Sequence, residues 1–129
     1  MNHSKDILII EDESITRTMY VSFFQKIAPE YNLYEACNAL EGLCLCFEKR
    51  PQLILLDMIM PEYSGEFILD VMEEGISKNI LSFIPKIIVV SSIDNANELM
   101  ELTKRLAVVS VMPKPLPFET LEELLKLHL

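Results

Sequence analysis

The chain has 129 residues, half of them hydrophobic, and a formal net charge of -9 at pH 7. This length suits one domain over residues 1–129, and the negative charge argues against binding of nucleic acid, because a duplex repels an acidic surface. No apolar run approaches the ~20 residues that span a bilayer, and the N-terminal segment lacks the regions of a signal peptide, so we expect a cytoplasmic protein that does not bind membranes.

Apolar runs of strand length alternate with segments of helical period in the first half of the chain. Residues 6–10 predict a strand, and residues 14–28 predict a helix whose buried face carries Ile15, Met19, Phe23, Phe24 and Ile27. Residues 32–36 predict a second strand. Residues 38–49 predict a second helix, capped by Asn38, whose inward side chains are Leu40, Leu43, Cys44 and Phe47.

The same alternation continues in the second half of the chain. Residues 53–57 predict a third strand, and residues 65–79 predict a helix buried through Phe67, Ile68, Val71 and Met72. A fourth strand is expected over 86–91 and a helix over 95–106. A fifth strand over 108–112 precedes the last helix, residues 117–129, whose apolar face holds Phe118, Leu121, Leu124 and Leu125.

The three cysteines, Cys37, Cys44 and Cys46, lie in or beside the second predicted helix. The count is odd and no C-x-x-C spacing occurs, so they cannot build a disulfide framework. A metal site is a poor alternative, because no histidine lies nearby in the sequence. We therefore expect the cysteines to act as small core hydrophobes.

Five successive strand–helix units predict an α/β fold in which a parallel sheet is covered by helices on both faces. The third and fourth strands are almost continuously apolar, as strands buried on both faces are. In open sheets of this kind, ligands bind beyond the carboxyl ends of the strands. The residues that end the strands are therefore the candidates for a functional site.

Polar side chains follow the predicted strands at one edge of the sheet. Glu11 and Asp12 follow the first strand, and Asp57 ends the third. Ser91, with Ser92 beside it, ends the fourth strand, and Lys114 follows the fifth. Each residue alone is weak evidence, because acidic residues favour helix N-termini and lysines favour solvent. Their combination at one edge indicates a site.

Three carboxylates at one edge repel each other by roughly 4 kcal/mol per pair at 4 Å and an effective dielectric near 20. A hard divalent cation with oxygen ligands removes this repulsion, and magnesium keeps open positions for water and phosphate. Lys114 adds a second positive charge and Ser91 adds a hydroxyl donor. A carboxylate such as Asp57 can attack phosphorus, so these side chains can hold a phosphoryl group.

With these residues in place, the chain resembles a response-regulator receiver domain over nearly its whole length. The matching segments are "ILIIEDES", "LILLDMIMPEYSG" with D-x-x-M-P-x-x-x-G spacing from Asp57 to Gly65, "KIIVVSS" and "VMPKPLP". The resemblance implies the flavodoxin-like, CheY-like fold: a five-stranded parallel sheet in the order 2-1-3-4-5 with five helices.

The resemblance also implies roles for the site residues. Asp57 would accept a phosphoryl group from the phosphohistidine of a sensor histidine kinase or a histidine phosphotransfer domain, and Ser91 and Lys114 would contact that group. Mg²⁺ or Mn²⁺ would be bound by Glu11, Asp12, Asp57 and the backbone carbonyl of Ile59. The Lys114–Pro115 bond would be cis.

The resemblance also implies a binding module and not an enzyme in the usual sense. Such a domain would catalyse only its own phosphorylation and dephosphorylation. Phosphorylation would switch binding of a downstream partner, or of a second copy, through the face formed by the fourth helix, fifth strand and fifth helix. Val111 stands where the family usually has an aromatic residue, so the signal would pass through shifts of the fourth helix. Ile59 and Ile93 cannot orient an attacking water, which predicts a long-lived acyl phosphate.

Two other classes use similar parts. A small phosphohydrolase of the haloacid-dehalogenase type would use Asp57 as nucleophile, but it normally has a second acid two residues later, where this chain has Ile59. A flavodoxin-like flavin carrier needs a phosphate loop after the first strand, where "EDES" would repel phosphate. Turnover of phosphomonoesters, or a yellow purified protein, would favour these alternatives.

Overall fold

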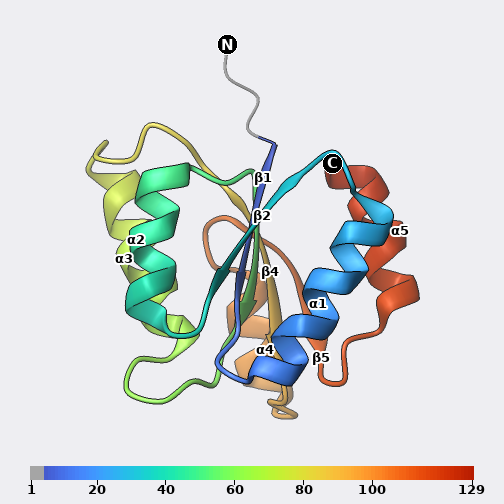
Figure 1. The fold of residues 1–129 in the computed structure, drawn as a ribbon. Coiled ribbons are helices and arrows are strands. Elements are labelled where there is room, and N and C mark those ends of the chain that lie inside the picture. Colours follow the sequence, from blue (N-terminus) through green and yellow to red (C-terminus); the bar gives the residue numbers. More distant parts are fainter. Residues whose placement is uncertain (1–4) are drawn as a thin grey trace.

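The computed structural model describes residues 5–129, and in this range five parallel strands form one sheet in the order β2-β1-β3-β4-β5 (Figure 1). The strands are β1 (Asp6–Ile10), β2 (Asn32–Ala36), β3 (Leu53–Asp57), β4 (Lys86–Ser91) and β5 (Val108–Pro113). The helices are α1 (Ser14–Ile27), α2 (Ala39–Lys49), α3 (Gly65–Ser77), α4 (Ala96–Thr103) and α5 (Phe118–His128). The predicted α/β class, strand order and number of elements are confirmed.

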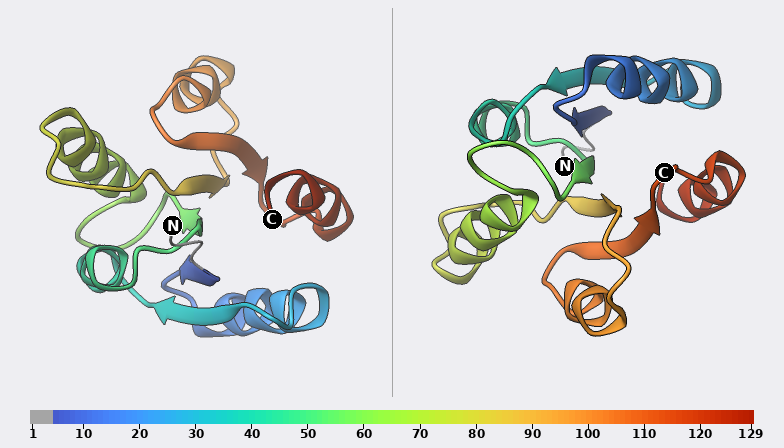
Figure 2. Two further views of the ribbon diagram at one scale, coloured as in Figure 1. Left: turned by 90° about the horizontal axis from the view of Figure 1, so that it is seen from above. Right: turned by 90° about the horizontal axis from the view of Figure 1, so that it is seen from below.

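Helices cover both faces of the sheet. Figure 2 shows α1 and α5 on one face and α2, α3 and α4 on the other. Successive side chains of a strand point to opposite faces, so Ile7 and Ile9 of β1 pack under α1 and α5, whereas Leu8 and Ile10 pack under α2 and α3. Every residue of β3 is buried. None of the helices between residues 5 and 129 is long and apolar enough to cross a membrane.

The buried face of α1 differs from the predicted one. Ile15 is 73% exposed and Met19 53% exposed, whereas Phe24 is buried as predicted and Tyr20, outside the predicted row, is buried too. A shift of one residue rotates the contact row by about 100° around a helix, and the row that meets the sheet consists of Tyr20, Phe24 and Ala28. Ile15 and Met19 therefore point to solvent near the N-terminal end of the helix.

The buried face of α2 also differs from the prediction. Its predicted inward residues Leu40, Cys44 and Phe47 are exposed, and the buried residues are Ala39, Gly42, Leu43 and Cys46. Small side chains on this row let α2 approach β1 closely: a Cβ on Gly42 would lie 2.7 Å from Cδ1 of Ile10. The expectation of three core cysteines is wrong for Cys37 and Cys44, which are exposed, and holds for Cys46. The Asn38 cap is confirmed, because its side chain accepts a hydrogen bond from the N–H of Glu41.

The fourth helix is shorter than predicted and ends at Thr103. The N–H groups of Lys104 and Arg105 donate to the carbonyls of Glu101 and Leu102, which tightens the last turn. Ala107 then adopts a left-handed backbone conformation with φ 74°, which a helix cannot continue through. This early turn places the side chain of Arg105 against α3, where it contacts acidic residues.

Candidate functional site

The predicted site residues gather at the carboxyl edge of the sheet, as the parallel topology requires. Glu11, Asp57 and Ser91 are the buried polar or charged residues of the described chain, each with an exposed fraction of 2% or less. Asp57 pairs in register with Val90, so Ser91 lies one residue beyond that pair. Lys114 follows β5, and its N–H donates to the carbonyl of Ser91 at 3.0 Å. Four strands thus each deliver one of these side chains to the same edge.

The carboxylate of Asp57 is only half satisfied. Its Oδ1 accepts a hydrogen bond from the N–H of Ile59 at 3.2 Å and lies 3.2 Å from Nζ of Lys114. Its Oδ2 is buried and has no hydrogen-bond partner within residues 5–129. A buried carboxylate oxygen without a partner is costly, so this atom is a place where a cation or a transferred group would lower the free energy.

Two further carboxylates stand beside Asp57. One ligand oxygen from each of Glu11, Asp12 and Asp57 lies within 4.8 Å of the others. Glu11 is tied down by the N–H of Glu13 at 3.1 Å and by Nζ of Lys114 at 3.1 Å, whereas Asp12 is exposed. A set of three hard oxygen donors, one of them open to solvent, fits a partly hydrated Mg²⁺. No described residue supplies a second cation besides Lys114 to this cluster.

The pKa values of the cluster follow from burial. Burial raises the pKa of Glu11 to about 7, with a further contribution from the charge of Asp57, although the Glu13 N–H and Lys114 oppose the increase. Burial also raises the pKa of Asp57, against the opposing effects of the Ile59 N–H and of Lys114. Partial burial lowers the pKa of Lys114, but its contacts with Glu11 and Asp57 outweigh this and raise it. Burial therefore disfavours the ionised forms of Glu11 and Asp57, and Lys114 offsets only part of this effect.

The side chain of Ser91 is fixed by the backbone just after β4. Its Oγ accepts a hydrogen bond from the N–H of Ile93 at 3.0 Å, which leaves the hydroxyl hydrogen available for another acceptor. The peptide bond between Lys114 and Pro115 is cis, as predicted. The Ile59 side chain is exposed, and its N–H contacts Asp57; the role of its carbonyl as a metal ligand stays a prediction.

Gly65 allows α3 to begin against the end of β3. A Cβ at this position would lie 2.7 Å from the backbone oxygen of Asp57 and 2.9 Å from Cα of Met58. The Gly65 N–H donates to the Met58 carbonyl at 3.0 Å. Sδ of Met58 would also lie 2.8 Å away. Since the other two clashing atoms are backbone, no side-chain movement relieves the contact, and a glycine is required here.

Two residues near the site were not predicted from the sequence. Arg17 donates from Nη1 to the backbone carbonyl of Glu11 at 2.7 Å and pairs with Glu35 of β2 at 3.2 Å, so it fixes the loop that carries the acidic pair. A cation near a helix N-terminus is unfavourable for the helix dipole. The position of Arg17 in the first turn of α1 could therefore have indicated from the sequence that this residue has a specific partner. Tyr20 is buried, and burial together with the charge of Glu11 raises its pKa to about 12.

The fold and this edge together define an α/β domain of the CheY-like class. The family model described as the response regulator receiver domain matches residues 7–126, and the chain belongs to this family. It is therefore a receiver domain of two-component signalling. The haloacid-dehalogenase alternative is not supported by any of these relationships, and the family match sets it aside.

Among curated proteins, the chain is similar to sporulation initiation phosphotransferase F of Bacillus subtilis, with 28% identity over 126 residues that cover 98% of this chain and 94% of that protein. It is also similar to the polar-differentiation response regulator DivK of Brucella anthropi, with 36% identity over 61 residues, or 47% of this chain and 48% of DivK.

Solved structures share the fold. The signal receiver domain of a DNA-binding response regulator from Colwellia psychrerythraea superposes with a TM-score of 0.81, at 24% identity and 95% coverage of both chains. The N-terminal domain of an uncharacterized protein from Wolinella succinogenes gives a TM-score of 0.79, at 26% identity and with 94% of this chain and 90% of that chain covered.

Proposed function

We propose that residues 1–129 form one receiver domain in which Asp57 accepts a phosphoryl group from a phosphohistidine. The observation that carries this proposal is Oδ2 of Asp57, a buried carboxylate oxygen without a partner, beside the carboxylates of Glu11 and Asp12. The donor would be a sensor histidine kinase or a histidine phosphotransfer domain. The phosphotransferase named among the relatives supports a place in a phosphorelay.

Glu11, Asp12, Asp57 and the carbonyl of Ile59 would hold Mg²⁺ or Mn²⁺, which fits the all-oxygen donor set. The bound dication supplies charge neutralisation for the phosphoryl oxygens. An oxygen of Asp57 attacks phosphorus, a P–O bond forms, and the P–N bond of the phosphohistidine breaks, so that the electron pair stays on the imidazole. Lys114 stands 3.2 Å from Asp57 and is positioned to offset the added negative charge.

Ser91 would respond to the new phosphoryl group. Its Oγ accepts from the N–H of Ile93, and a χ1 rotation toward a phosphoryl oxygen would carry Oγ away from that N–H while the O–H donates to the phosphoryl oxygen. The segment between β4 and α4 would then shift. Val111 has no ring to follow this movement, so we place the response in α4 and in the face formed by α4, β5 and α5, where Met100 and Leu106 are exposed.

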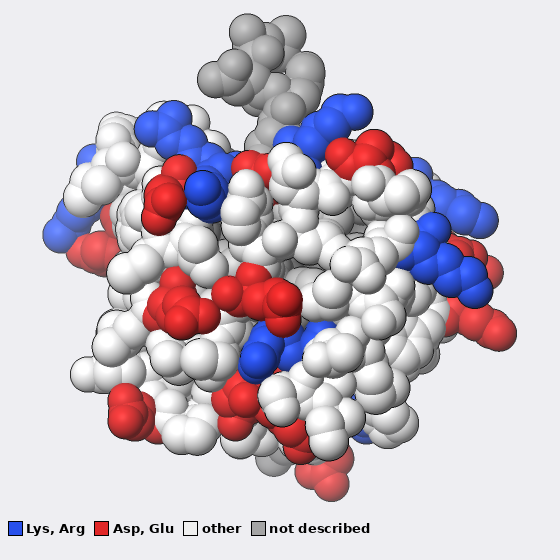
Figure 3. Space-filling model, viewed as in Figure 1, with Lys and Arg blue, Asp and Glu red and all other residues white. Residues whose placement is uncertain are grey.

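The surface charge of the domain bears on its location in the cell and on its binding partners. Figure 3 shows acidic and basic side chains interspersed on one face, without a continuous basic patch. Together with the net charge of -9, this supports a cytoplasmic domain that binds neither nucleic acid nor membrane itself. A protein partner, or a second copy in a homodimer, would read the α4–β5–α5 face.

Incubation with acetyl phosphate and Mg²⁺, followed by intact-mass measurement, tests the function. We expect a gain of one phosphoryl group that disappears in Asp57→Asn and on chelation of the metal. Turnover of p-nitrophenyl phosphate is expected to be absent. An unchanged mass with Mg²⁺ present, or a phosphoryl group retained by the Asp57→Asn variant, would contradict the proposal.

A further inference from the structure

A groove with a cavity volume of about 460 Å³ opens between α3 and α4. Its floor is apolar and consists of Met58, Ile93 and Leu102, and its rim carries the carboxylates of Glu66, Glu98 and Glu101. We call this site the α3–α4 groove. The groove lies on the side of α4 that faces α3, whereas α5 covers the other face of the sheet. It therefore differs from the α4–β5–α5 face discussed above.

The α3–α4 groove already holds one guanidinium at its end, which shows what its walls accept. Arg105 is half-buried and contacts Asp70 at 2.5 Å, Glu73 at 2.6 Å and Glu66 at 3.5 Å. These contacts direct its hydrogen-bond donors toward α3. The α3 wall is thus built to bind a planar cation, since carboxylates bind guanidinium groups in a specific geometry.

The remaining carboxylates of the rim are not neutralised. Glu98 has no ion pair within residues 5–129, and Glu101 pairs only with Lys104, at 3.6 Å, where both side chains are mostly exposed. Such an exposed pair contributes ~1 kcal/mol or less. The α4 wall therefore offers free negative charge beside an apolar floor, which is complementary to a cationic segment with an apolar anchor.

The floor of the α3–α4 groove is connected directly to the phospho-acceptor site. Met58 follows Asp57, and its N–H donates to the carbonyl of Val90 at 3.2 Å. The N–H of Ile93 donates to the hydroxyl of Ser91 at 3.0 Å. A rotation of Ser91 about χ1 that moves Oγ removes that hydrogen bond, so the position of Ile93 in the groove depends on the rotamer of Ser91.

We propose that the α3–α4 groove binds a polypeptide segment of a partner protein in which an apolar side chain is flanked by arginine or lysine. The apolar side chain occupies the floor, and the cations meet Glu98 and Glu101. A second copy of this chain is not the occupant of this groove, because the acidic rim requires cationic side chains and the chain has 20 acidic against 11 basic residues. Phosphorylation of Asp57 changes the affinity through Ile93, and this second part rests on the proposed function.

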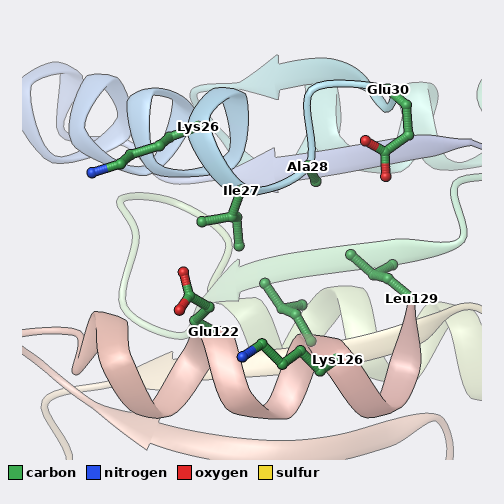
Figure 4. A pocket seen from close by; sticks show the side chains of 8 residues that line it. Lys26, Ile27, Ala28, Glu30, Glu122, Lys126 and Leu129 are labelled. Atoms are coloured by element: carbon green, nitrogen blue, oxygen red, sulfur yellow. The ribbon is translucent and has the colours of Figure 1, made fainter.

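A second groove provides an internal control. It lies between α1 and α5, has a volume of about 420 Å³, and carries two lysines and two glutamates on its walls, Lys26, Lys126, Glu30 and Glu122 (Figure 4). Its charges balance, so it has no preference for a cation. A Glu122→Lys substitution there changes the net charge of the protein by the same amount as Glu98→Lys in the α3–α4 groove.

The test measures binding of a set of short peptides in which Leu, Ile, Phe or Met is flanked by arginine at graded spacings, with glutamate-flanked peptides as the negative set. Backbone NMR shifts report the binding site and the Kd. We expect arginine-flanked peptides to shift Ile93 and Leu102, and Glu98→Lys to weaken binding about tenfold. Glu122→Lys is expected to change the Kd less than about twofold, as a distant charge screened by salt does.

Beryllofluoride with Mg²⁺, a stable mimic of the phosphoryl group, tests the coupling. We expect the peptide Kd to change about threefold or more in the wild type and not in Asp57→Asn. Absence of binding by every peptide, equal weakening by Glu122→Lys, or a dimer in light scattering that Glu98→Lys disrupts would overturn the docking site. An unchanged Kd in a protein that still gains a phosphoryl group would overturn only the coupling. Peptide binding in a protein that cannot be phosphorylated would overturn the proposed function and leave the groove intact.

Discussion

Nζ of Lys114 lies 3.1 Å from Oε1 of Glu11, a carboxylate 103 positions away in the sequence. The same ammonium lies 3.2 Å from Asp57. One cation therefore serves two buried acids, which is not enough to neutralise both. In the proposed function, Lys114 would compete with a metal ion for these carboxylates and would also be a partner for an incoming phosphoryl group.

Replacing Lys114 with Gln should separate these two roles. We expect Mg²⁺ to bind several-fold more tightly, because a positive charge beside the site has been removed. We expect phosphorylation by acetyl phosphate to slow about tenfold or more, because the charge that offsets the phosphoryl group is gone. Calorimetric Mg²⁺ titration and intact-mass time courses measure the two effects. Weaker Mg²⁺ binding in the variant would show that Lys114 supports the metal site.

The stability of the metal-free protein should depend on pH through Glu11. Its pKa in the folded protein is about 7, above its ordinary value of 4.5, mainly because it is buried. Between these two values the folded protein binds more protons than the unfolded chain, so the free energy of unfolding decreases as the pH rises. We expect a loss of at most about 3 kcal/mol across this window, measured by urea unfolding in the presence of chelator.

Two comparisons identify Glu11 as the source of this pH dependence. Glu11→Gln removes the titrating group, so its unfolding free energy should vary less between about pH 5 and about pH 8 than that of the wild type. Mg²⁺ should restore stability to the wild type at the upper end of the range, because it binds the ionised form. A wild-type protein that becomes more stable over this range without metal would contradict the assignment.

The fold and most of the site could be predicted from the sequence, because strand order and edge chemistry depend on local patterns. Apolar runs marked β3 and β4, and the parallel topology then brought Glu11, Asp57 and Ser91 to one edge. Helix faces were less predictable. The buried row of α2 is made of small residues such as Gly42, which carry a weak hydrophobic signal, while Leu40 and Phe47 face solvent.

Side-chain contacts between elements that are far apart in the sequence could not be predicted from sequence patterns. Arg17 reaches back to the carbonyl of Glu11, and Arg105 reaches across to α3. Both depend on how a helix is oriented, and the Arg105 contact also depends on the early end of α4 at Thr103. Periodicity describes one helix at a time, so it contains no information on which charges of two helices meet.

Gly65→Ala should damage both stability and phosphorylation. The added Cβ would lie 2.7 Å from the backbone oxygen of Asp57, so either α3 or the acceptor strand must move. We expect a loss of about 1–3 kcal/mol in the free energy of unfolding, as overpacking costs, and slower phosphorylation by acetyl phosphate. Chemical unfolding and intact mass measure the two effects.

Gly75→Ala is the matched control on the same helix. Its Cβ would meet only the Leu81 side chain, at 3.0 Å, and alanine favours a helix interior over glycine by about 1 kcal/mol. We expect stability to be unchanged or increased and phosphorylation to stay normal. An equal loss of stability and of phosphorylation in both variants would show that any change in α3 causes these losses, whether or not it lies close to Asp57.

The acyl phosphate should be long-lived because the side chains beside it cannot bind water. Ile59, 57% exposed, and Ile93, half-buried, follow Asp57 and Ser91 by two residues and carry no hydrogen-bonding group. Ile59→Asn introduces an amide that can orient an attacking water, so we expect the half-life of the phosphorylated protein to shorten several-fold. Ile80→Asn, which alters a side chain that is 70% exposed in the α3–β4 connection, should leave the half-life unchanged. Decay of the phosphorylated mass in Mg²⁺ after removal of acetyl phosphate measures it. A wild-type half-life of only seconds, or an equal effect of both substitutions, would contradict the role assigned to Ile59.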